Sequence, residues 1–156
     1  MSRTAKAALG MVVLAAVAVS LLRRRQQSDP EQLLRSYYDA WTDGDGDAVR
    51  DLLAEDYCGH VHTISGTEEH GADELAARVA SHAEAFESVE YELEDVLACD
   101  GEVAARVTMR ARHRETERDA ETTGIVILRL EDGRIAEEWS SWDYLGLAEQ
   151  LGLSNS

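Results

Sequence analysis

The chain has 156 residues, and its 31 aspartate and glutamate residues outnumber its 15 lysine and arginine residues, for a formal net charge of −16. A chain of this length forms one domain with a single modest core. Nucleic acid is excluded as a partner, because no basic stripe is present to neutralise phosphates. Lys6 is the only lysine. Such a surface suits a halophile, where salt screens self-repulsion, and an arginine-biased, GC-rich genome would produce it equally well.

An apolar segment stands at the start of the chain. Residues 7–22 carry no charge and are followed by three consecutive arginines. A helix over about residues 5–22 approaches the roughly 20 residues that a membrane span needs, with Lys6 reaching the interface. A cleaved signal peptide is the alternative, but its small-x-small sites fall inside the apolar run, and the arginines oppose translocation. We therefore expect residues 1–27 to be an uncleaved single-pass membrane anchor, with the domain on the cytoplasmic side.

Three helices are predicted in the first half of the remaining chain. Ser28 and Glu31 form a capping-box pattern, and apolar residues from Leu33 to Trp41 then recur with a period of 3.6. Residues 48–55 predict a second short helix and residues 73–86 a third. Between them, residues 57–64 read as a strand, and residues 66–74 read as a loop.

The second half alternates apolar and polar residues, which is typical of strands. Strands are predicted over residues 89–97, 103–111, 124–130 and 134–143, with Asp-Gly turns at residues 100–101 and 132–133. Helices followed by an antiparallel meander predict an α+β domain over residues 28–156, in which a curved antiparallel sheet packs on three N-terminal helices.

Histidines and cysteines are few. Cys58 and Cys99 lack CxxC spacing, so we expect two buried or half-buried thiols and no disulfide framework. His60 and His62 share a strand face, a spacing that can chelate zinc or copper. No third candidate ligand has a sequence spacing typical of a metal site, so we expect none. His113 falls at the end of the strand over 103–111. His113 therefore lies either at the rim of the core or in a pocket, and the sequence does not distinguish these two positions.

The last predicted strand carries the candidate acid. In an extended strand Trp139 and Asp143 point to the same face. If that face is the inner one, desolvation would raise the pKa of Asp143 and make it a general acid or base. Alternatively, Asp143 is the N-cap of a short helix that ends before Gly152. The sequence leaves both open.

Several motifs occur in a familiar order. They are "LLRSYYDAWTDGDGDAVRDLLAEDY", "GH" at 59–60, "HGADEL" at 70–75, "AF" at 85–86, and the closing "TTGIVILRLEDGRIAEEWSSWDYLGLAEQLG". In these motifs the segment from Leu33 to Gly152 resembles the SnoaL-like polyketide cyclases, also called ester cyclases. They belong to the nuclear-transport-factor-like, or cystatin-like, superfamily.

The resemblance implies a cone-shaped sheet around an apolar pocket, in which a polyketide ester closes by an intramolecular aldol reaction without a cofactor. By this resemblance, the family's catalytic acid/base corresponds to Asp143, and its pocket histidine corresponds to His60. Two departures leave the substrate open. Glu87-Ser88 stands where the family has Pro-Asp, and residues 114–121 replace Gly-rich turns; both segments are expected at the pocket rim.

We therefore expect a membrane-anchored domain whose pocket takes a small hydrophobic molecule for a cyclisation, isomerisation or hydration. Asp143 would be the catalytic group, with His60 or His113 as the second. The residues expected to line the pocket are Tyr38, Trp41, His62, Met109 and Trp139. The alternative is a non-catalytic binding or dimerisation module of the same fold, and a homodimer is compatible with either.

Overall fold

The computed structural model describes residues 29–153. The predicted anchor over about residues 5–22 lies outside them, and within residues 29–153 no helix is both long and apolar enough to cross a membrane. The elements are α2 (Pro30–Asp43), α3 (Gly46–Leu52), β1 (Leu53–Thr63), β2 (Gly66–His70), α4 (Ala72–Ala85), β3 (Phe86–Cys99), β4 (Glu102–His113), β5 (Asp119–Glu131), β6 (Arg134–Trp142) and α5 (Tyr144–Leu151). The predicted α+β class is confirmed.

One sheet holds all six strands in the order β2-β1-β6-β5-β4-β3. The strands β3 to β6 form the predicted antiparallel meander, but β1 pairs with β6 in parallel. The expectation of a wholly antiparallel sheet was therefore wrong, and the sheet is mixed. Parallel neighbours need a long crossover, which α4 and the meander supply between β1 and β6. The predicted loop over residues 66–74 also proves to contain β2, which pairs with β1.

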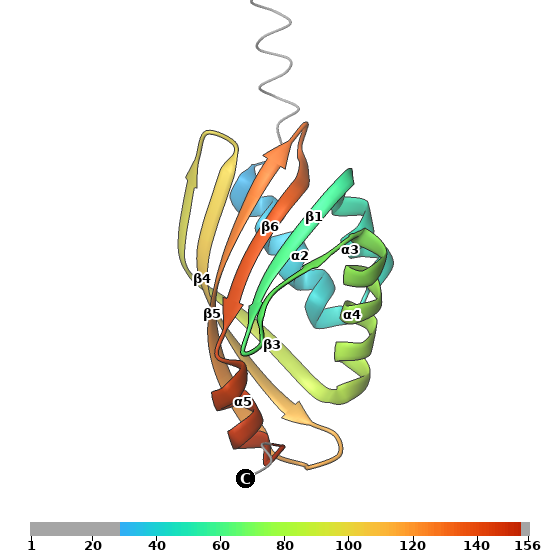
Figure 1. Cartoon of the computed structure of the whole chain (residues 1–156), viewed down its shortest axis with the longest axis vertical. Coiled ribbons are helices and arrows are strands. Elements are labelled where there is room, and N and C mark those ends of the chain that lie inside the picture. Colours follow the sequence, from blue (N-terminus) through green and yellow to red (C-terminus); the bar gives the residue numbers. More distant parts are fainter. Residues whose placement is uncertain (1–28, 154–156) are drawn as a thin grey trace, which may run out of the picture.

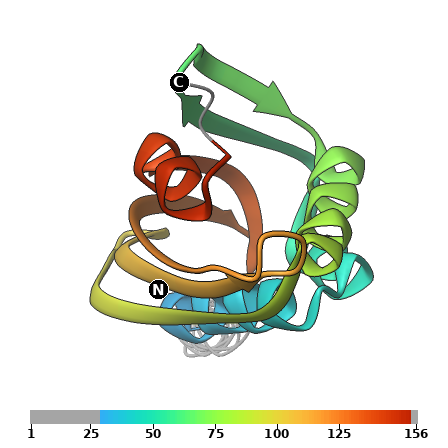
Figure 2. The ribbon, with the colours of Figure 1, turned by 90° about the horizontal axis from the view of Figure 1, so that it is seen from below.

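The sheet is strongly curved (Figures 1 and 2). The three predicted helices, α2, α3 and α4, lie along its concave side, while α5 follows β6 at the lower end of the sheet in Figure 1. Buried residues of α2 such as Leu34 and Tyr37 pack against buried strand residues such as Val107 and Leu128. Each fully buried side chain of this size contributes roughly 1.5–3 kcal/mol, so packing onto α2 stabilises the curved sheet.

A β-bulge in β6 decides which side chains face the helices. Arg129 of β5 lies opposite Glu137, yet Leu130 lies opposite Ile135, so Ala136 is an extra residue on β6. Both Ile135 and Ala136 are buried. Because side chains alternate with period two, one inserted residue moves every later side chain to the other face.

The bulge corrects the predicted orientation of Trp139. Simple alternation from Ile135 put Trp139 on the inner face. In the structure Glu138, Ser140 and Trp142 line the concave side instead, and Trp139 stacks on the ring of His60 outside the cavity.

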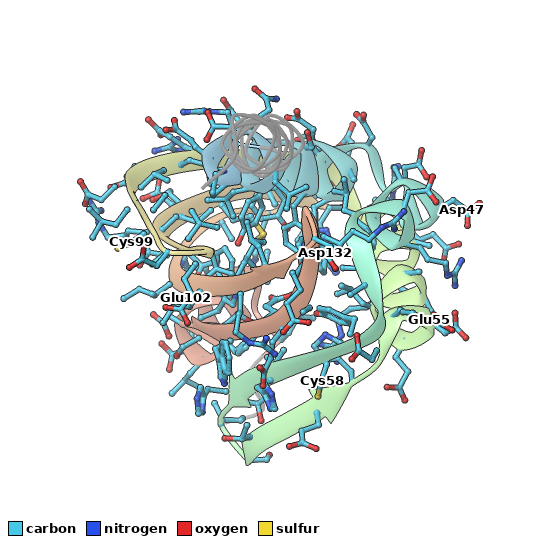
Figure 3. All side chains as sticks on the ribbon, turned by 90° about the horizontal axis from the view of Figure 1, so that it is seen from above. Asp47, Glu55, Cys58, Cys99, Glu102 and Asp132 are labelled. Carbon is cyan, nitrogen blue, oxygen red and sulfur yellow. The ribbon has the colours of Figure 1, made fainter. Side chains whose placement is uncertain are left out.

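Polar and charged residues cover the outer surface. Figure 3 shows Asp47, Glu55 and Glu102 pointing away from the core, and all three are exposed. Cys58 on β1 and Cys99 at the end of β3 lie on different sides of the molecule in the same view. Both cysteines are free thiols; Cys58 is half-buried, as expected, but Cys99 is exposed, so the expectation of a buried or half-buried thiol was wrong for Cys99.

Candidate functional site

A cavity of about 260 Å³ lies between the concave face of the sheet and helices α2, α4 and α5. This volume lies just below the range of about 300–1,000 Å³ that is common for pockets of drug-sized ligands, so the cavity suits a molecule smaller than these. Its lining consists of Tyr37, Tyr38, Trp41, Val61, His70, Leu75, Arg78, His82, Phe86, Tyr91, Met109, Thr122, Glu138, Ser140, Trp142, Tyr144 and Leu147. Three residues predicted to line the pocket, Tyr38, Trp41 and Met109, are among them.

Aromatic rings make up much of the cavity wall. The ring of Tyr91 lies 5.0 Å from that of Tyr38 and 6.2 Å from that of Trp142. Trp142 reaches this position because residue 124, its partner on β5, is glycine. A Cβ on Gly124 would overlap the indole of Trp142. The wall can therefore hold a flat apolar molecule.

The single carboxylate in the cavity wall belongs to Glu138, of which only 5% is exposed. Its Oε2 accepts hydrogen bonds from the hydroxyls of Tyr37, at 2.7 Å, and Tyr57, at 2.8 Å. Burial raises the pKa of both tyrosines well above the usual value, so the phenols stay protonated donors. Within residues 29–153 no group donates to Oε1 of Glu138, which leaves this oxygen available to a ligand.

His70 extends this group of polar residues. Its Nε2 lies 3.3 Å from the Tyr57 hydroxyl. Since the proton of that hydroxyl goes to Glu138, Nε2 must carry the hydrogen that it donates to Tyr57, and Nδ1 is left as an acceptor. Burial lowers the pKa of His70, which keeps the ring neutral. Residue 59 makes room for the ring, because a Cβ on Gly59 would overlap His70 and come within 2.5 Å of the Tyr57 hydroxyl.

Three buried nitrogen atoms at the cavity have no hydrogen-bond partner within the described residues. They are Nε1 of Trp41, Nδ1 of His70 and Nδ1 of His82. Burial lowers the pKa of His82 to about 4, so its ring is neutral near pH 7. Buried polar atoms are nearly always paired in proteins, so three unpaired nitrogens on residues that line one cavity are unusual.

The residues predicted to be catalytic lie elsewhere. Asp143 is exposed and caps α5, where its Oδ1 accepts a hydrogen bond of 2.8 Å from the amide of Gly146. His60 lies on the outer face of β1, with its Nε2 3.0 Å from Glu137. Neither residue lines the cavity.

The other two predicted histidines also lie apart from the cavity lining. His62 is exposed, and its Nδ1 lies 2.9 Å from the hydroxyl of Thr67. His113 packs its ring against Phe86 at the end of β4, and its Nδ1 accepts a bond of 3.3 Å from the amide of Thr116. This is the position at the rim of the core. Across residues 29–153 no group of three or more His, Cys, Asp and Glu side chains is arranged to hold a metal ion.

Sequence reasoning missed Glu138, His70 and Arg78, which line the cavity. One signal was present for Glu138: the consecutive apolar residues Ile135 and Ala136 interrupt the alternation just before it, as a bulge does. The sequence carried no such signal for His70 and Arg78.

A curved sheet that encloses an apolar cavity against helices is consistent with the nuclear-transport-factor-like class of α+β domains. Within that class, the chain belongs to the SnoaL-like polyketide cyclase family, which it matches over residues 31–151. The resemblance found in the sequence is thereby confirmed. Among proteins with curated descriptions, none matches this chain.

Solved structures show the same fold. Wild-type IdmH from Streptomyces antibioticus, a proposed polyketide cyclase, is 24% identical and has a TM-score of 0.71, covering 80% of this chain and 99% of its own. AclR from Streptomyces galilaeus, a proposed hydroxylase, is 19% identical with a TM-score of 0.71, covering 83% of this chain and 89% of its own. PhzB2 of Pseudomonas aeruginosa, a phenazine biosynthesis-related protein, is 17% identical with a TM-score of 0.60, covering 83% and 88% respectively. At these identities the likeness establishes the fold and leaves the reaction open.

Proposed function

We propose that this domain binds a small hydrophobic carbonyl compound and catalyses a cofactor-free proton transfer, of the cyclisation or isomerisation type, with Glu138 as the acid/base. The observation that carries the proposal is a single buried carboxylate that faces an aromatic cavity with one oxygen free. Apolar walls with few convergent polar groups are typical of small-molecule sites. The relatives described as a cyclase and a hydroxylase agree with small-molecule chemistry on this fold.

The proposed step needs no redox partner. Oε1 of Glu138 takes a proton from the carbon next to the ligand's carbonyl, and the electron pair of that C–H bond becomes an enolate. The enolate then attacks a second carbonyl and closes a ring, and the alkoxide so formed takes the proton back from Glu138. In an isomerisation, Glu138 instead returns the proton to another carbon of the enolate. Tyr37 and Tyr57 hold the carboxylate in one orientation throughout. The base is therefore already oriented for proton transfer when the ligand binds.

This proposal moves the acid/base from Asp143 to Glu138. A carboxylate that accepts a helix-capping bond at the surface is surrounded by water and lies away from the cavity lining. The same observation favours the second candidate function, a non-catalytic binding module, because the residue that the family resemblance assigns to catalysis is used as a cap. The two functions differ in one measurable property, which is proton exchange on a bound ligand.

Deuterium exchange tests the proposal without knowledge of the natural substrate. We would incubate the full-length chain with 2-tetralone in D2O and follow loss of the α-hydrogen signal by NMR. The wild-type protein should accelerate exchange, and Glu138→Gln should lower the rate by about 100-fold, the lower range of general acid/base effects. Glu137→Gln is the matched control, since this neighbour lies on the outer face with His60. Wild-type exchange in a folded Glu138→Gln variant would leave the binding module as the function.

We also propose that residues 5–22 anchor the domain in a membrane. The support is the uncharged run over residues 7–22 and the three arginines that follow it. Fractionation of cells that express the full chain tests this. Recovery in the membrane pellet after carbonate extraction is expected, and recovery in the supernatant would contradict it.

A further inference from the structure

One cationic side chain in the cavity wall has no counter-ion. Arg78 of α4 lines the cavity and is half-buried. It forms no ion pair and donates no hydrogen bond within residues 29–153. By contrast, the arginines that do pair with carboxylates are Arg35, Arg50, Arg106, Arg110, Arg112 and Arg129. Arg114, Arg118 and Arg134 also form no ion pair within the described residues, but all three are exposed, whereas Arg78 is half-buried at a cavity and therefore calls for a physical explanation.

The charge of Arg78 lies on the side of the cavity that holds the polar groups. Burial is the main cause of the raised pKa of Tyr57 and Tyr144 and of the lowered pKa of His70, and the positive charge of Arg78 lowers the pKa of all three. Leu75, Arg78 and His82 all face the cavity from one side of α4. Arg78 thus lines the same cavity as His70, Glu138 and Tyr144, and no carboxylate within residues 29–153 pairs with it.

Glu138 does not supply the missing partner. Its Oε2 is bound by two tyrosine hydroxyls, and it forms no ion pair with Arg78. A partly desolvated guanidinium without a counter-ion is costly, and a carboxylate restores its hydrogen bonds in a bidentate, charge-assisted pair.

The geometry points to a small hydrophobic acid as the ligand of this cavity, with its carboxylate on Arg78 and its apolar body against the aromatic wall. This inference rests on the proposed function for the existence of the ligand site, and it adds the chemical class of the ligand. A single molecule can have both the carboxylate and the apolar body, because the unpaired cation and the aromatic rings around one end of α4 belong to the same cavity lining.

Matched pairs of acids and amides test the inference. We would measure binding of benzoate and 2-naphthoate, and of benzamide and 2-naphthamide, to the full-length chain by calorimetry at fixed ionic strength. The wild-type protein should bind each acid about tenfold or more tightly than its amide, the range of a charge-assisted pair. In Arg78→Gln the acids should lose that advantage while the amides bind within twofold of wild type.

Two further variants separate charge from structure. Arg114→Gln removes an arginine that is exposed, forms no ion pair within the described residues and lies outside the cavity lining, and it should bind like wild type. Arg78→Lys keeps the charge without the planar fork and should retain part of the preference for acids.

Equal binding of acids and amides by the wild type, or an unchanged preference in folded Arg78→Gln, would overturn the inference and leave the proposed function standing. Failure of all four probes to bind would contradict the ligand site itself, and with it the proposed function.

Discussion

The hydroxyl of Tyr37 donates a hydrogen bond of 2.7 Å to Oε2 of Glu138, which joins α2 to β6 across 101 residues of sequence. Tyr57 donates a second bond to the same oxygen from β1. The carboxylate thus connects α2 to β1 and β6 and also forms part of the cavity wall. Fold stability and the proposed chemistry share this contact.

Removing one hydroxyl should therefore affect stability measurably. Tyr37→Phe leaves the buried carboxylate with a single donor, and we expect the free energy of unfolding to fall by about 1.5–3 kcal/mol, the range for hydrogen bonds to charged groups. Urea denaturation measures the change. Tyr38→Phe is the matched control, since this adjacent residue is also buried and its hydroxyl makes no hydrogen bond within residues 29–153. Equal effects of the two substitutions would show that the bond to Glu138 contributes nothing.

His82 should make stability depend on pH. Burial lowers its pKa from 6.5 to about 4, and the rings packed on it come from Trp41, Phe86 and Tyr91, none of which titrates in this range. As the pH falls below about 6.5, the unfolded chain takes a proton that the folded chain excludes, so stability is lost progressively down to about pH 4. The loss amounts to at most about 3 kcal/mol.

Unfolding curves at several pH values check this prediction. The chain has 31 acidic residues that also titrate, so the informative quantity is the difference in slope between variants. His82→Gln should flatten the dependence between pH 6.5 and 4 by up to about 1.4 kcal/mol per pH unit. His62→Gln, which removes an exposed imidazole, should leave the slope unchanged. A slope in His82→Gln identical to wild type would mean that His82 has the same pKa in the folded and unfolded chains.

Much of the fold follows from local patterns in the sequence. The alternation of Val103, Val107 and Met109 correctly predicted which face of β4 is buried. The glycine at residue 152 correctly predicted the end of α5, where its φ is 71°. Such features depend on neighbours within a few residues. The parallel pairing of β1 with β6 depends instead on where the chain returns after α4 and three strands, and no local pattern specifies that.

The site was harder to predict than the fold for a related reason. A single inserted residue, Ala136, exchanges the two faces of β6 and brings Glu138 inward in place of Trp139. The partners of Glu138 stand far away in sequence, on α2 and β1. Periodicity alone therefore predicts a carboxylate near a tryptophan, but selects the wrong pair of residues for the cavity wall.

Gly59 should be essential to the position of His70. A Cβ at residue 59 would overlap the imidazole and approach the Tyr57 hydroxyl, so Gly59→Ser must displace one of them. Overpacking of this kind costs about 1–3 kcal/mol, and urea denaturation should show a loss of that size. In Gly71→Ser the added Cβ meets nothing within 4 Å, and residue 71 is the N-cap of α4, a position where serine is favoured, so stability should not fall. A stable Gly59→Ser variant with an unchanged His70 NMR spectrum would contradict the packing described here.

Substitutions of Asp143 distinguish a helix-capping role of this residue from a catalytic role. Its carboxylate accepts a bond from the amide of Gly146 at the start of α5, so Asp143→Ala should lower the free energy of unfolding by about 1 kcal/mol, while Asp143→Asn retains the cap. Because Asp143 does not line the cavity, both variants should exchange the α-hydrogens of 2-tetralone at the wild-type rate. Loss of exchange in a normally folded Asp143→Asn variant, with exchange intact in Glu138→Gln, would return the catalytic role to Asp143. Glu138 would then serve to hold α2 and β1 against β6.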